Sequence, residues 1–160
     1  MFKQLKHILS ASYLIKAPSY IFILIFLCLS LLLGFITTFL PEPDMKGSLV
    51  ADNVVIDLLI AVIVVPLIET LLFQGLIIEI VCKIIKRPRK NICIAVMASS
   101  LAFALNHTYS IGYFIITLLA GIILALAYYL GRNRKEGGII LVFIIHSIYN
   151  LSSSIYNLVS

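Results

Sequence analysis

Long apolar runs dominate the chain, and short polar or charged segments separate them. The first run, residues 19–40, carries no charge and is long enough to cross about 30 Å of hydrocarbon at about 1.5 Å per residue. Four more runs follow, at about 54–82, 91–107, 111–130 and 139–158. The pattern predicts an all-α, polytopic membrane helical bundle of about five transmembrane helices. In this bundle, residues 54–158 form a four-helix core and residues 19–40 add a first transmembrane helix.

The N-terminal segment has a different pattern. Residues 1–18 mix lysines with apolar side chains, which predicts a short amphipathic segment lying in the interface of the cytoplasmic leaflet. A signal peptide is the competing interpretation. The apolar run that follows is too long for the apolar part of a signal peptide, and it ends without a small-residue cleavage site.

Composition and charge support a membrane location. The chain is 62% hydrophobic and 12% charged, whereas soluble domains are about half apolar and a quarter charged. The net charge of +5 comes from basic residues beside the apolar runs, so topology and anionic lipid explain it better than nucleic acid. The basic clusters lie at the N-terminus, at 83–90 and at 132–135. The positive-inside rule then predicts a multi-pass protein of the cell membrane with its N-terminus cytoplasmic and its C-terminus outside.

The second apolar run is unusual because it contains a carboxylate near its middle. Glu69 lies there, three residues after Pro66. An ionisable group at that depth is costly unless it is paired or used, so it marks a candidate functional site. Proline displaces the carbonyl four residues earlier, here that of Val62, and bends the helix. The bend is expected to open space or to leave a free backbone acceptor near the carboxylate.

Later runs supply polar partners for Glu69. His146 and Asn150 are four residues apart and therefore share a helix face, as do Phe103 and His107. At about 1.5 Å per residue, the depths of these groups allow Glu69, His107, His146 and Asn150 to reach one cavity. The alternative is structural, because histidines in membranes often serve as hydrogen-bond partners between helices, and Glu69 would then only pair with one of them.

This set of side chains fits hydrolysis of an amide. A buried carboxylate can take a proton from water, and a neighbouring imidazole can orient that water or protonate the leaving amine. His146 and Asn150 could present two donors to a developing oxyanion. No serine or cysteine has the context of a catalytic triad.

Three motifs in order resemble a known family. They are Glu69 with Phe73-Gln74-Gly75, Phe103-xxx-His107, and His146-xxx-Asn150. Together they resemble the CPBP (Abi) family, which comprises the CAAX prenyl endopeptidases and the bacteriocin-processing or immunity-associated membrane proteins. The resemblance covers about residues 54–158. It implies that Glu69 activates water, that His107 is the histidine of the second motif, and that His146 and Asn150 contribute to the oxyanion site.

The chain departs from the family pattern at two positions. Thr70 stands where a second glutamate is usual, and Gln74 stands where an arginine is usual. Because the two residues are four apart, we expect them to share a helix face. We therefore predict that they form a neutral, hydrogen-bonded substitute for an ion pair.

The leading functional prediction is an intramembrane endopeptidase in the lipid bilayer, acting on a membrane-associated peptide, a CAAX-like tail or another membrane protein. We expect no cofactor, with water activated directly by Glu69, although one carboxylate, two imidazoles and an amide could instead hold Zn²⁺. One alternative is a non-catalytic bacteriocin-immunity or peptide-binding membrane protein. Another is a small transporter or proton relay, which the lack of an inverted repeat disfavours.

Overall fold

Helices account for nearly all of the computed structural model, which describes residues 11–37, 53–86 and 88–159. The described residues contain no strand, and the predicted all-α membrane bundle is confirmed. The predictions for residues 1–10, for the end of the first span at 38–40 and for the polar loop up to 52 lie outside the described residues. The helices are α2 (Ala11–Lys16), α3 (Ser19–Thr37), α4 (Val54–Leu59), η1 (Ile60–Val64), α5 (Val65–Glu69), η2 (Thr70–Leu76), α6 (Ile77–Ile84), α7 (Pro88–Leu105), α8 (Ile111–Gly131) and α9 (Gly138–Val159).

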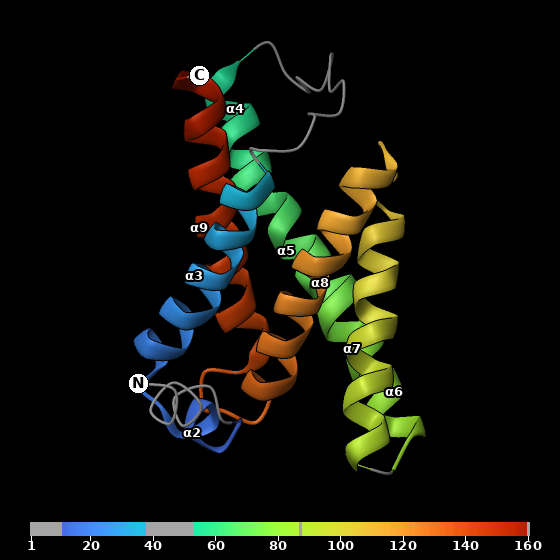
Figure 1. The fold of residues 1–160 in the computed structure, drawn as a ribbon. Coiled ribbons are helices and arrows are strands. Elements are labelled where there is room, and N and C mark those ends of the chain that lie inside the picture. The colour runs from blue at the N-terminus through green and yellow to red at the C-terminus, as the bar shows by residue number, and fades with distance from the viewer. Residues whose placement is uncertain (1–10, 38–52, 87, 160) are drawn as a thin grey trace.

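Four of the helical regions are long and apolar enough to cross a membrane, which makes this a multi-pass membrane protein. They are Ser19–Thr37, Val54–Ile84, Ile111–Gly131 and Gly138–Tyr156. The run predicted as a further span at 91–107 forms most of α7, but its apolar helical part, Asn91–Leu105, is shorter than these four. In Figure 1, α7 nevertheless runs back beside α6 and α8 along the bundle.

The region Val54–Ile84 is one continuous helix of 31 residues that changes its hydrogen-bonding register along its length. Two π-helical segments, η1 and η2, lie on either side of the α-helical turn α5. At about 1.5 Å per residue, a helix this long exceeds the hydrocarbon thickness of about 30 Å, so it must tilt. It crosses Figure 1 diagonally, from α4 near the end of α9 to α6 beside α7.

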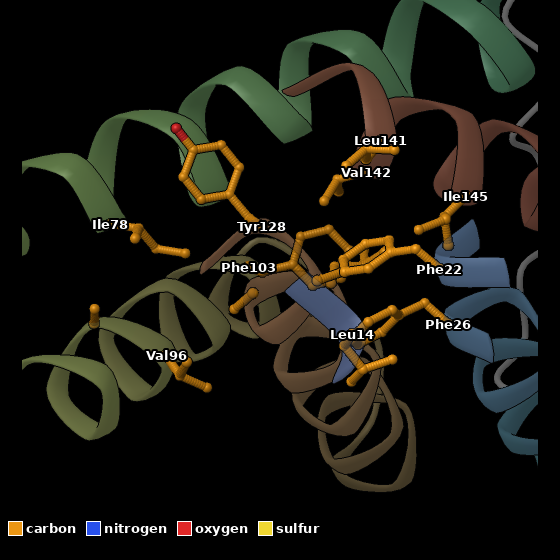
Figure 2. Packing of buried hydrophobic residues seen from close by; sticks show 14 residues of the cluster. Leu14, Phe22, Phe26, Ile78, Val96, Phe103, Tyr128, Leu141, Val142 and Ile145 are labelled. Carbon is orange, nitrogen blue, oxygen red and sulfur yellow. The ribbon is translucent and has the colours of Figure 1, made fainter. Parts of the chain in front are cut away.

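The apolar core lies where α3, α8 and α9 meet. Phe22 and Phe26 of α3 pack there with Leu141, Val142 and Ile145 of α9 (Figure 2). On the other side of the bundle, α7 packs closely on α8. A Cβ at Gly121 would lie 3.0 Å from the Cα of Ser100, so the small residue lets these two helix backbones approach.

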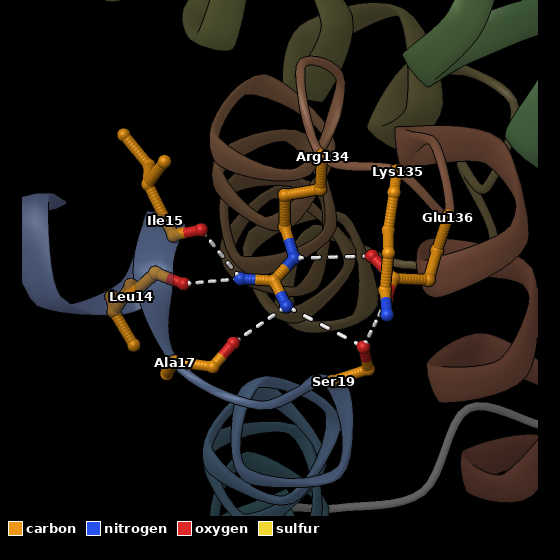
Figure 3. A network of polar contacts seen from close by, with 7 residues as sticks. All are labelled: Leu14, Ile15, Ala17, Ser19, Arg134, Lys135 and Glu136. Atoms are coloured by element: carbon orange, nitrogen blue, oxygen red, sulfur yellow. Dashed lines mark hydrogen bonds and ion pairs between the residues drawn. The ribbon is translucent and has the colours of Figure 1, made fainter.

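A single arginine fastens the N-terminal helices to the turn between α8 and α9 (Figure 3). The guanidinium of Arg134 donates to the carbonyls of Leu14, Ile15 and Ala17 at 2.7, 2.8 and 2.7 Å. Because the last carbonyls of a helix lack partners within it, these bonds cap the C-terminus of α2. Leu14 itself is only 5% exposed. The described end of the predicted interfacial segment is therefore held by contacts within the protein.

Candidate active site

The carboxylate of Glu69 lies between two histidine rings. Its Oε1 is 3.4 Å from Nε2 of His107, and its Oε2 is 3.6 Å from Nε2 of His146. Glu69 ends α5, one turn after Pro66, and is only 8% exposed. The structure thus brings together three of the four residues singled out in the sequence, from three separate helical regions.

His107 reaches Glu69 from just beyond the end of a helix. The α-helix α7 ends at Leu105, and the backbone N–H of His107 donates to the carbonyl of Ala104 at 2.9 Å, which tightens the last turn. The Nδ1 of His107 lies 2.8 Å from the carbonyl oxygen of Phe103. Because a carbonyl can only accept, Nδ1 carries a hydrogen and Nε2 faces the Glu69 carboxyl group. A proton on either the carboxyl group or Nε2 therefore completes the contact between these two residues.

His146 approaches the other oxygen of Glu69 from α9. Its side chain is buried, and its Nδ1 has no hydrogen-bond partner among the described residues. The ring of Phe103 lies against both histidines, with centroids 4.6 Å from His107 and 6.0 Å from His146. Phe103 also makes an edge contact with Phe73 at 5.7 Å. An apolar ring thus holds the two imidazoles apart while both face the same carboxylate.

One neighbour of the site was missed in the sequence. Tyr113 lies with its ring centroid 6.2 Å from that of His107, and the edge of its ring meets Tyr109 at 5.3 Å. Tyrosines are common at membrane interfaces, so the residue type alone does not mark Tyr113 as a neighbour of the site. Ser110 caps α8 by accepting the N–H of Tyr113 at 3.1 Å, which fixes the start of the helix that carries Tyr113.

Asn150, the fourth predicted site residue, contacts the backbone of the long helix. Its Nδ2 donates to the backbone carbonyl of Ala61, in η1, at 2.9 Å. The sequence predicted a free acceptor near the proline but placed it at Val62. The carbonyl that accepts the hydrogen bond of Asn150 is that of Ala61, one residue earlier, because the helix there is π-helical rather than α-helical. The oxyanion role of Asn150 stays a prediction.

The predicted hydrogen bond between Thr70 and Gln74 is wrong. Both side chains are fully buried, and neither Oγ1 of Thr70 nor either polar atom of Gln74 has a hydrogen-bond partner within the described residues. A spacing of four residues places two side chains on one side of a helix, but it does not bring their polar atoms into contact. The site therefore contains buried polar atoms that no described protein group satisfies.

The sequence led us to expect no metal ion at Glu69, His107, His146 and Asn150. Across the described ranges, no group of three or more His, Cys, Asp or Glu side chains is arranged to hold a metal ion. Independence from metal stays a prediction, and a chelation experiment tests it below.

Comparison with known proteins identifies the class. The chain matches the family model described as type II CAAX prenyl endopeptidase Rce1-like over residues 51–152, which include Glu69, His107, His146 and Asn150. The match spans more than half of the 160 residues, and the chain therefore belongs to this family of membrane proteases. No curated protein and no solved structure matches the chain.

Proposed function

We propose that this protein is an intramembrane endopeptidase that uses Glu69-activated water to cleave a peptide bond in a membrane-associated peptide or CAAX-like tail. The observation that carries this proposal is the Glu69 carboxylate held 3.4 and 3.6 Å from the two imidazoles, in a chain of a protease family. An acid–base group between two proton carriers is what hydrolysis of an amide needs.

The reaction assigns one task to each group. Glu69 takes a proton from water while the water oxygen bonds to the carbonyl carbon of the substrate. The C–N bond then breaks, and the proton passes to the leaving amine through Nε2 of His107, whose other nitrogen is fixed by the carbonyl of Phe103. His146 stabilises the negative oxygen of the tetrahedral intermediate. Phe103 keeps the floor of the site apolar, which strengthens these electrostatic interactions.

We also propose that the basic end of the bundle faces the cytoplasm. Helix α2, the end of α6 and the turn between α8 and α9 lie at one end of the molecule, and the C-terminal end of α9 lies at the other (Figure 1). Lys16, Lys83 and Arg132 belong to the first end. The positive-inside rule supports this orientation. Labelling of single cysteines by a membrane-impermeant reagent, at each end in turn, tests it.

The proposed activity is tested by cleavage of a prenylated CAAX peptide by purified protein in liposomes. Glu69→Gln removes the proton acceptor in a nearly isosteric side chain and is expected to abolish cleavage. Glu79→Gln is the matched control, because Glu79 lies on the same long helix but pairs with Arg132 at 3.7 Å and with Tyr128. Cleavage that survives Glu69→Gln would remove Glu69 from the mechanism, and equal loss in both variants would indicate damage to the helix.

Two further arms of this assay separate the other predicted functions. Peptide binding without cleavage, in wild type and in Glu69→Gln alike, would favour the non-catalytic peptide-binding or immunity role. Strong chelators are expected to leave cleavage unchanged, and purified protein should carry no stoichiometric Zn²⁺. Activity that chelation removes and added metal restores would instead make Glu69 and the histidines metal ligands.

A further inference from the structure

The side chain of Asn150 replaces a backbone donor that the long helix lacks. At the end of the π-helical segment η1, the N–H of Val65 donates to the carbonyl of Ile60, five residues earlier. The next donor in this register would be residue 66, pointing to the carbonyl of Ala61. Residue 66 is proline and has no N–H. The carbonyl of Ala61 instead accepts from Nδ2 of Asn150 at 2.9 Å.

This contact joins the two helices that carry the site. Asn150 lies one turn after His146 on α9, and Pro66 lies one turn before Glu69. Both Pro66 and Glu69 are buried, and α9 packs along η1, α5 and η2. A hydrogen bond from α9 to Ala61 therefore fixes how the α5 turn sits against α9, and with it the distance of 3.6 Å between Glu69 and His146.

The geometry points to Asn150 as a positioning residue: its amide substitutes for the missing N–H of Pro66 and so holds Glu69 in register with His146. This role differs from that of an oxyanion donor, because the amide acts through the Ala61 carbonyl and not on the substrate. The effect on turnover rests on the proposed peptidase function. The structural link between Asn150 and Pro66 does not depend on that function.

A cycle of two substitutions tests the link. Alanine at residue 66 has the N–H that proline lacks, so P66A is expected to supply a backbone donor to Ala61. In the wild-type background, N150A should lower the unfolding midpoint in detergent by about 2–4 °C. It should also lower kcat by up to about 10²-fold, the loss that a small misplacement of reacting groups causes, with little change in KM. In the P66A background, N150A should change the unfolding midpoint and kcat only slightly.

Asn91 provides the matched control. Its Nδ2 donates to the carbonyl of Ile85 at 2.7 Å, far from Pro66 along the chain. N91A should lower the unfolding midpoint by the same amount whether or not P66A is present, because distant effects add.

The outcomes separate the two roles of Asn150. Equal losses of kcat from N150A in both backgrounds would show that Asn150 acts on the reaction itself and would overturn the positioning role. Equal losses of the unfolding midpoint in both backgrounds would show that the amide does not substitute for the proline N–H. If the wild type cleaves no peptide, the proposed function fails while the unfolding midpoints still decide this inference. If N150A alone does not fold, recovery of folded protein in the double variant is expected, and continued failure contradicts the proposal.

Discussion

Two clusters of polar side chains lie within this bundle or at its edge, and they differ in how many of their polar atoms have hydrogen-bond partners. Around Arg134, both terminal nitrogens of the guanidinium donate hydrogen bonds, and only Nε has no hydrogen-bond partner among the described residues. Three backbone carbonyls and the hydroxyl of Ser19 accept from its terminal nitrogens, and Glu136 lies 3.6 Å from its Nε. Around Glu69 the contacts to the two histidines are longer than ordinary hydrogen bonds, and unpartnered atoms lie along the helix that follows.

This difference agrees with a structural role for the Arg134 cluster and with the catalytic role that we propose for the Glu69 cluster. A charged group whose donors are mostly used can do little else, because a change of partner leaves an oxygen or nitrogen without its bond. The Glu69 cluster keeps proton-carrying atoms that are near one another but not consumed by protein contacts. Its spare hydrogen-bonding capacity is what a substrate amide or a water molecule requires. Substitutions at four positions test this comparison.

The largest effect is expected for the Glu69 cluster. Glu69→Gln should lower turnover by about 10²–10⁴-fold, the usual contribution of a general base. Its unfolding midpoint should stay close to that of the wild type, because the amide keeps the packing. Parallel measurement of peptide cleavage and thermal unfolding in detergent checks the expected loss of turnover and the expected unfolding midpoint. A large loss of stability with a small loss of turnover would place Glu69 in the structural class instead.

The Arg134 cluster should respond in the opposite way. Arg134→Ala leaves the carbonyls of Leu14, Ile15 and Ala17 without these donors. An unsatisfied buried group costs about 1–3 kcal/mol, and the cost is smaller at Ile15, where the carbonyl is exposed and water can replace the donor. We expect a lower unfolding midpoint but an unchanged KM and kcat for the molecules that remain folded. Arg134→Lys should recover only part of the stability, because an ammonium lacks the planar fork of the guanidinium. Full recovery with lysine would show that charge alone holds the contact.

A smaller effect is expected at Thr70. Its hydroxyl is fully buried and has no partner among the described residues, so Thr70→Val should leave stability unchanged or raise it, by less than about 1 kcal/mol. Turnover is the informative measurement. A loss of kcat/KM without a loss of stability would assign the hydroxyl to the substrate or to the attacking water. A clear loss of stability would instead contradict the absence of a partner.

The smallest effect concerns pH at the basic turn. The hydrogen bond from Ser19 lowers the pKa of Glu136, and the neighbouring Arg134 acts in the same direction. A carboxyl group whose pKa is depressed in the folded state stabilises the fold above its unfolded pKa, and that contribution is lost as the pH falls through the folded value. The midpoint difference between wild type and Glu136→Gln should therefore shrink on acidification below about pH 4. A midpoint difference that does not change with pH would show that the charge of Glu136 does not stabilise the fold.

The sequence was sufficient for the features that depend on side-chain type and spacing. Long apolar runs predicted the membrane helices, and a carboxylate near the middle of such a run indicated Glu69. The two histidines were found because each stands in a helical motif with a second recognisable residue. His107 still lies beyond the end of its helix, so its contact with Glu69 depends on a tightened turn that the spacing argument did not include.

What the sequence did not predict depends on backbone atoms. Every residue has a carbonyl, so nothing marks those of Leu14, Ile15 and Ala17 as partners of Arg134, and the basic turn was interpreted only as a topology signal. The backbone acceptor freed by Pro66 was predicted at Val62, one residue after the carbonyl that accepts from Asn150, because a π-helical register leaves no clear mark in the sequence. The Thr70–Gln74 error has a different origin, because a hydrogen bond between side chains depends on their direction as well as on their spacing.

The Arg134 contact also sets an order for the biogenesis of this chain. Arg134 and Leu14 are 120 residues apart in the sequence, so the carbonyls at the end of α2 are synthesised long before their donor. At about 5–20 residues per second, the delay is about 6–24 s. Until then, the contacts of α2 and α3 with Arg134 and with α9 cannot form. The emergence of the turn between α8 and α9 from the ribosome therefore lets the bundle close, and the described helices that are synthesised first are among the last to become fixed in place.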